Sequence, residues 1–123
     1  MWEIQNETVF GAAHKLRAVE GEGERLHGHN WRVRVFVRAS ALAPEGWVLD
    51  FAELGRTLRG LVEPWEHVYL NEVSPWDKLN PTAENIARYL AEEMQRLLGS
   101  ERVFVHRVEV FETDECCATF YRA

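Results

Sequence analysis

Two histidines stand two positions apart at the start of a strand-like run of the chain. His27 and His29 precede residues 31–37, and side chains at positions i and i+2 of a strand point to the same face. A third histidine, His14, lies upstream on another extended stretch. Three neutral imidazoles that converge and leave one position open are typical of a catalytic zinc site. The His-x-His spacing alone fits ordinary polar histidines as well, and His14 joins the other two only if the two stretches pair as a hairpin.

The segments that carry these histidines are predicted to be strands. Residues 2–10 alternate in polarity, and the extended pattern runs on to His14. Over residues 31–37 apolar side chains alternate with arginines, as in an antiparallel strand with one face against a core. His27 and His29 have the parity of the apolar side chains, so we expect them at the end of the core-facing side. The polar, glycine-containing residues 15–25 predict a loop between the strands.

Two helices and two further strands are predicted downstream. Asp50 is a candidate N-cap of a helix that runs to about Val62, and Thr82 of a second helix that ends near Gly99. The connection over residues 63–81 is too aromatic for a solvated linker, and long ordered loops often carry function. Strands are predicted over residues 103–112 and 116–122. The order ββααββ predicts one α+β domain over residues 1–123, with an antiparallel four-stranded sheet and both helices on one face.

Composition and charge exclude several classes of protein. The chain has 123 residues, of which 46% are hydrophobic and 28% charged, as in a globular domain. A net charge of −6 argues against a nucleic-acid partner. No apolar run approaches the roughly 20 residues that span a membrane, and no signal peptide is visible. The two cysteines, Cys116 and Cys117, are adjacent and do not form a disulfide framework, so we expect a cytoplasmic protein.

Six short motifs occur in one order along nearly the whole chain. They are Phe10-x-Ala12-Ala13-His14, His27-Gly28-His29, Leu49-Asp50-Phe51, Glu66-His67-x-x-Leu70-Asn71, Pro81-Thr82-Ala83-Glu84-Asn85 and Glu112-Thr113. Together they resemble the 6-pyruvoyltetrahydropterin synthase and 6-carboxytetrahydropterin synthase family. The resemblance implies the tunnelling fold, in which trimers join their sheets into a barrel and two trimers stack as a hexamer. It also implies Zn2+ on His14, His27 and His29, and 7,8-dihydroneopterin triphosphate as the substrate, bound at a subunit interface.

The same resemblance implies a proton relay. Glu66 and His67 match an acidic residue followed by histidine, with Glu where the family usually has Asp. Zinc acts as a Lewis acid that acidifies protons on the substrate side chain, and a base and relay then move those protons. Taken without the resemblance, His67 is an ordinary loop histidine.

Substrate-binding roles follow from the resemblance too. Glu112 would hold the pterin ring through two parallel hydrogen bonds, and Thr82 and Thr113 belong to the same predicted subsite. From the residues alone, Glu112 is an exposed acid at a strand end and Thr82 a helix cap. The triphosphate needs cations, for which the candidates near the zinc loop are Lys15, Arg17 and Arg25.

One motif of the family is missing. The catalytic base is usually a cysteine four residues before the first histidine of His-Gly-His, and that position is Gly23 here. The next residue, Glu24, resembles a family variant in which a glutamate three residues before that histidine replaces the cysteine. That variant is associated with cleavage of the side chain to 6-hydroxymethyl-7,8-dihydropterin, a folate precursor. A carboxylate works as a base there if burial raises its pKa against the pull of the metal; otherwise Glu24 is one of several acids in a solvated loop.

Three functions are therefore predicted as alternatives. The leading one is a zinc-dependent lyase that forms 6-hydroxymethyl-7,8-dihydropterin, with Glu24 as its base. The second is a 6-carboxytetrahydropterin synthase of queuosine and deazapurine biosynthesis, against which the missing cysteine counts. The third is a non-catalytic zinc- or pterin-binding protein that kept the histidine cage and lost the base.

Overall fold

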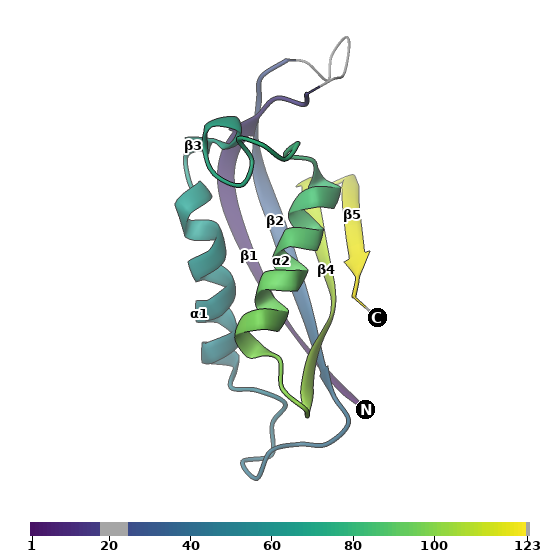
Figure 1. Cartoon of the computed structure of the whole chain (residues 1–123). Coiled ribbons are helices and arrows are strands. Elements are labelled where there is room, and N and C mark those ends of the chain that lie inside the picture. The colour runs from purple at the N-terminus through teal and green to yellow at the C-terminus, as the bar shows by residue number, and fades with distance from the viewer. Residues whose placement is uncertain (18–24, 123) are drawn as a thin grey trace.

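The computed structural model describes residues 1–17 and 25–122, and its elements follow the predicted order (Figure 1). The long strands are β1 (Trp2–His14), β2 (His27–Ala39), β4 (Val103–Thr113) and β5 (Cys116–Tyr121). The helices are α1 (Phe51–Val62) and α2 (Ala83–Leu98). The predicted α+β class and both helices are therefore confirmed, and β2 begins early enough to include His27 and His29.

The sheet has one strand more than predicted. Residues 63–81 contribute β3 (Val68–Tyr69), which lies between the short 3-10 helices η2 (Glu63–Trp65) and η3 (Leu70–Glu72). β3 pairs in parallel with β1 at Ala12 and Ala13, so the five-stranded sheet is mixed, in the order β3-β1-β2-β4-β5. A strand of two residues is too short to show the alternation from which strands are predicted.

The hairpin of β1 and β2 sets the register on which the histidines depend. Phe10 pairs with Trp31, Ala12 with His29 and His14 with His27. The rings of Phe10 and Trp31 are stacked with centroids 6.0 Å apart, and both side chains are fully buried. Because side chains alternate across a strand, His14, His27 and His29 extend the core-facing side of this hairpin.

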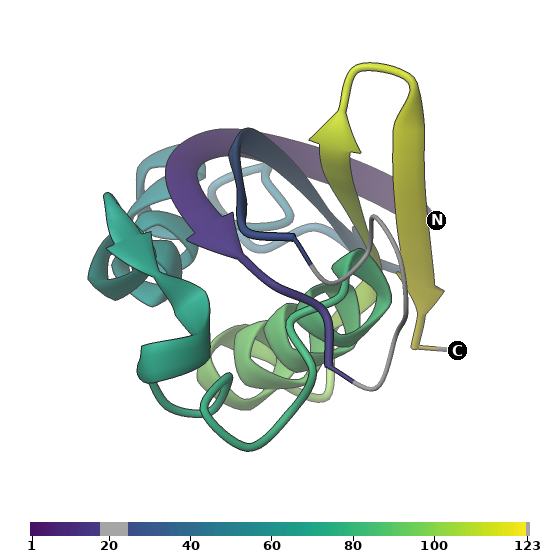
Figure 2. The same cartoon turned by 90° about the horizontal axis from the view of Figure 1, so that it is seen from above.

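Both helices lie on the same side of the curved sheet (Figure 2). Each contributes a stripe of buried apolar side chains: Leu54, Leu58 and Val62 from α1, and Ile86, Leu90, Met94 and Leu98 from α2. The predicted caps are confirmed, since the Asp50 carboxylate accepts a hydrogen bond from Ala52 N–H (3.0 Å) and the Thr82 hydroxyl accepts one from Asn85 N–H (3.0 Å).

The opposite side of the sheet is polar. Arg34 pairs with Glu7 (2.6 Å), and Glu3 pairs with both Arg38 (3.1 Å) and Arg107 (3.1 Å). The Arg107 guanidinium also lies 3.6 Å from the centre of the Phe36 ring. These ion pairs engage Arg34 and Arg38 of β2, in keeping with the polar face that the sequence pattern predicts for this strand.

The ends of several strands and the start of α2 meet at one end of the sheet. β1 ends there, β2 and α2 begin there, and β4 turns into β5 there (Figure 1). Side chains from these elements can therefore reach a common point, and most of the candidate site residues lie there.

Candidate metal centre

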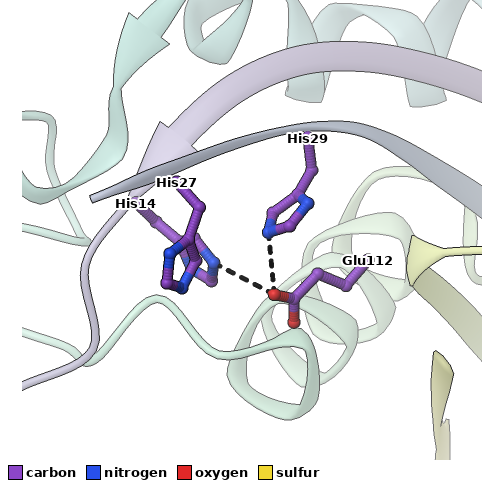
Figure 3. A group of neighbouring side chains, drawn as sticks. All are labelled: His14, His27, His29 and Glu112. Carbon is purple, nitrogen blue, oxygen red and sulfur yellow. Dashed lines mark hydrogen bonds and ion pairs between the residues drawn. The ribbon is translucent and has the colours of Figure 1, made fainter. Parts of the chain in front are cut away.

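Four side chains converge at this end of the sheet (Figure 3). His14 comes from the end of β1, His27 and His29 from the start of β2, and Glu112 from the end of β4. One ligand atom from each lies within 4.8 Å of all the others. The buried Trp31 ring packs against two of the imidazoles, 4.8 Å from the His14 centroid and 5.5 Å from that of His29. The predicted trio is thus brought together, and Glu112 joins it.

The hydrogen bonds of His14 fix which of its nitrogens faces the cluster. The side chain is fully buried, and its Nδ1 lies 2.8 Å from the Pro81 carbonyl oxygen. A carbonyl only accepts hydrogen bonds, so Nδ1 carries the proton and donates it. Nε2 then carries a lone pair, and it points to Glu112 Oε1 at 3.3 Å. Histidines that bind metals usually donate their other N–H to a carbonyl or carboxylate in this way.

The centre of the cluster is rich in lone pairs. Glu112 Oε1 lies 2.9 Å from His29 Nε2, a buried nitrogen that makes no hydrogen bond within the described part of the chain. Burial lowers the pKa of His29, and the nearby His14 and His27 lower it further, while Glu112 opposes them. Imidazole nitrogens and a carboxylate oxygen that face one point form a donor set that can hold a metal cation.

The distances suit zinc. A tetrahedral ion with bonds of 2.0–2.2 Å holds its ligand atoms about 3.3 Å apart. The contacts of Glu112 with His14 (3.3 Å) and His29 (2.9 Å) are close to that spacing. Three imidazoles and a carboxylate are also a donor set that Zn2+ accepts. Bound there, zinc would supply Lewis acidity toward the oxygens of a substrate.

Arg17 holds the loop that supplies the Pro81 carbonyl. Its guanidinium donates to the carbonyl oxygens of Asn71 (3.3 Å), Trp76 (2.6 Å) and Leu79 (2.9 Å). The side chain of Asn80 bonds to the Arg17 backbone N–H (2.8 Å) and carbonyl (3.3 Å). These contacts tie the residues after His14 to the loop before α2. Arg17 was predicted to contact phosphate, but its guanidinium is engaged in this clamp; Lys15 and Arg25 are exposed.

Glu66 and His67 lie on the other face of the hairpin. Glu66 accepts a hydrogen bond from Gly11 N–H (2.7 Å) and pairs with Arg59, and both interactions lower its pKa. Glu66 Oε1 is 3.7 Å from His67 Nε2, too far for a hydrogen bond. A Cβ placed on Gly11 would meet Asn30, Glu66 and His67. His67 therefore lies over the face of the hairpin opposite to the one that carries the three imidazoles.

Glu112 also borders a cavity. The cavity measures about 170 Å³ and lies between the start of α2 and the start of β5, lined by Ala83, Glu84, Glu112, Cys116, Cys117 and Ala118. Thr82, just before it, uses its hydroxyl as the α2 cap, and the Thr113 hydroxyl accepts a hydrogen bond from Glu115 N–H (3.3 Å). Of the predicted pterin residues, Glu112 lines this cavity, whereas Thr82 and Thr113 are neighbours in sequence of lining or cluster residues and use their hydroxyls in a cap and a turn.

The sequence did not predict some groups of the site, and two of the predicted residues lie outside the described part of the chain. The Pro81 carbonyl and the Arg17 clamp have no sequence signature, since one is a backbone group and the other bonds to backbone groups. The approach of Glu112 to the trio has a partial signal, because it shares the parity of the buried Val108 and Val110. Gly23 and the predicted base Glu24 lie outside the residues that the structure describes.

Comparison with known proteins agrees with this geometry. The family described as 6-pyruvoyl tetrahydropterin synthase matches residues 3–123. A 6-carboxy-5,6,7,8-tetrahydropterin synthase of Synechocystis sp. is 36% identical over 98% of this chain and 94% of its own length. A dihydroneopterin monophosphate aldolase of Pyrococcus furiosus is 33% identical over 86% of this chain and 85% of its own. The fold of Caenorhabditis elegans 6-pyruvoyl tetrahydropterin synthase matches with a TM-score of 0.85 at 23% identity, covering 99% and 96% of the two chains.

The chain belongs to the 6-pyruvoyl tetrahydropterin synthase family, and it is a pterin enzyme of that family. The resemblance carried by the six motifs is thereby confirmed. Within the described ranges, no helix has the length and apolar character needed to cross a membrane.

The clamp leads to a prediction about stability. Arg17→Ala removes three hydrogen bonds to carbonyl oxygens, so we expect a loss of about 1–2 kcal/mol in the free energy of unfolding. For a domain of this size that corresponds to a fall in Tm of roughly 3–10 °C by calorimetry. Arg17→Lys should restore only part of it, because an ammonium lacks the planar fork that reaches several carbonyls at once.

The matched control is Arg88→Ala, which removes an exposed arginine of α2 that makes no ion pair with the described residues. Its Tm should stay close to that of the wild type. Equal melting of the Arg17 and Arg88 variants would show that the clamp does not stabilise the loop.

Proposed function

We propose that the protein is a zinc-dependent lyase that cleaves the side chain of a 7,8-dihydroneopterin phosphate to leave 6-hydroxymethyl-7,8-dihydropterin. The observation that carries this proposal is the convergence of the three imidazoles, combined with a sequence in which Gly23 replaces the usual thiol base and is followed by Glu24. The relative from Pyrococcus furiosus, named as an aldolase of the monophosphate, supports the same type of reaction.

The cleavage needs one proton removed and one delivered. In the proposed step, the Glu24 carboxylate takes the proton of the hydroxyl on the second side-chain carbon. The bond between the first and second carbons breaks, and its electron pair passes to the first carbon, where the conjugated ring stabilises it. A proton delivered by His67 completes the hydroxymethyl group. The second product is a two-carbon aldehyde that carries the phosphate.

A second function is supported by one observation. The relative from Synechocystis sp., named as a 6-carboxy-5,6,7,8-tetrahydropterin synthase, covers nearly the whole chain. The two functions differ in the catalytic base they require. The synthase usually has a cysteine at this position, and Gly23 has no side chain that accepts a proton. We therefore place the lyase first.

Incubation of the zinc-loaded protein with 7,8-dihydroneopterin monophosphate and triphosphate, with products identified by mass spectrometry, tests the proposal. We expect 6-hydroxymethyl-7,8-dihydropterin, and a fall in kcat of about 10²- to 10⁴-fold in Glu24→Gln. Glu22→Gln is the matched control, since it makes the same change two residues away and should keep its turnover. A 6-carboxy product would favour the second function, and pterin binding without turnover would favour a non-catalytic binder.

We also propose that the active site is completed by a second copy of the chain. The imidazole trio and His67 are on opposite faces of the β1–β2 hairpin, so one chain does not direct both at one substrate. An open hollow of about 600 Å³ is bordered by His67 and Tyr69 and by strand residues that include Gly11, His29 and Asn30. β5 and residues 2–11 of β1 each leave one edge without a partner strand in the described chain. Such edges pair readily with another chain, in keeping with the predicted barrel of trimers and the hexamer.

Mixed oligomers test this sharing directly. His14→Ala and His67→Ala should each be inactive alone, because each lacks one half of the site. When the two variants are co-assembled, about one interface in four joins an intact trio to an intact His67 at random mixing, so activity should partly return. The reaction rate and the native mass of the mixture are the measurements. Co-assembly without any recovered activity would contradict a shared site.

A further inference from the structure

We infer that Glu112 is a fourth metal ligand in the substrate-free protein and that it leaves the metal to hold the pterin ring when substrate binds. This inference rests on the zinc-binding part of the proposed function, and not on which product is formed. The sequence motif points only to the second of these two roles.

The first support is the position of the carboxylate. Glu112 Oε1 approaches two imidazole nitrogens at once, at 3.3 Å from His14 and 2.9 Å from His29. The carboxylate points into the space between the imidazoles (Figure 3). These contacts have the spacing of neighbouring ligand atoms around one tetrahedral zinc ion.

The second support is the chemical type of its neighbours. In the described ranges, the only ion-pair contacts of Glu112 are with His14 and His29, and it has none with lysine or arginine. His14 Nε2 presents a lone pair, because its Nδ1–H is donated to Pro81. A carboxylate oxygen and an imidazole lone pair repel each other unless a proton or a metal cation lies between them, and three imidazoles around the same point favour the metal.

The third support is that Glu112 contributes both to the group of metal-binding side chains and to the lining of the neighbouring cavity. It is part of the cluster of metal-binding side chains, and it also lines the cavity between α2 and β5. The side chain is about one-third exposed, and rotation about its own bonds would carry the carboxylate from one place to the other. Pairing with a ring amide N–H and a 2-amino group uses both oxygens, so the carboxylate holds the ring or the metal, and not both.

Exchange of Glu112 would couple ring binding to the metal. The fourth position would be closed by a carboxylate at rest and would open as the ring takes Glu112 away. The substrate side chain would then find an open coordination position only after its own ring is in place.

Metal affinity tests the resting role without any turnover. Competition with a chelator should show that Glu112→Gln binds Co2+ and Zn2+ about 10- to 100-fold more weakly than the wild type. Glu115→Gln makes the same change three residues away at an exposed turn, and its metal affinity should equal that of the wild type. Unchanged metal affinity in Glu112→Gln would overturn the inference.

The visible spectrum of the Co2+ protein tests the exchange. Pterin itself is the probe, because it has the ring but no side chain that could bind the metal. Saturating pterin should change the Co2+ absorption of the wild type toward that of pterin-free Glu112→Gln. If pterin binds, as followed by its fluorescence, and the Co2+ absorption stays the same, the exchange does not occur. If the wild type does not bind pterin at all, the exchange is likewise excluded. Neither spectrum depends on product formation, so a failed lyase assay would leave this result standing.

Discussion

The hydrogen bond from His14 to the Pro81 carbonyl is the interaction on which the rest of the site depends. It joins the end of β1 to the residue just before the α2 cap, 67 positions along the chain. It decides the tautomer of a fully buried imidazole and directs the other nitrogen toward His27, His29 and Glu112. Because Arg17 and Asn80 hold the same loop, the His14 imidazole, the loop before α2 and the Thr82 cap are positioned together.

The two faces of the β1–β2 hairpin carry two different groups of candidate site residues. Alternation along β1 and β2 directs the imidazoles toward the helices, whereas Gly11 and Asn30 face the other way, next to His67. The absence of a side chain at Gly11 leaves room for Glu66 and His67 to lie against the strand. The proposed assembly would bring the outer face of one copy to the imidazole end of another, and the unpaired edges of β5 and of residues 2–11 in the described chain would allow it.

Patterns that repeat along the chain were enough to predict most of the fold. Alternation predicted the long strands, leucine spacing and caps predicted both helices, and the parity of His27 and His29 with Trp31 predicted their common face. The unpredicted features come from single contacts between distant segments. β3 is too short to show alternation, and the Pro81 carbonyl is a backbone group that every residue possesses.

The position of Glu112 likewise depends on contacts between distant segments. Its parity with Val108 and Val110 indicates the core-facing side of β4. Its approach to the imidazoles also depends on the register of β2 against β4, which shifts at a bulge between Phe36 and Val37. In the sequence, the shift shows only as a change of parity in the apolar residues of β4, from Val103 and Val105 to Val108 and Val110. Motifs therefore named the residues of the site, while pairing across the sheet determined which of them meet.

Calorimetric titration of zinc into the metal-free protein tests the central claim most directly. The three imidazoles and Glu112 predict one tightly bound zinc per chain, with binding lost in His14→Ala and retained in His106→Ala, which changes a histidine outside the cluster. Zinc bound by His14→Ala with the stoichiometry and affinity of the wild type would contradict this structure of the site.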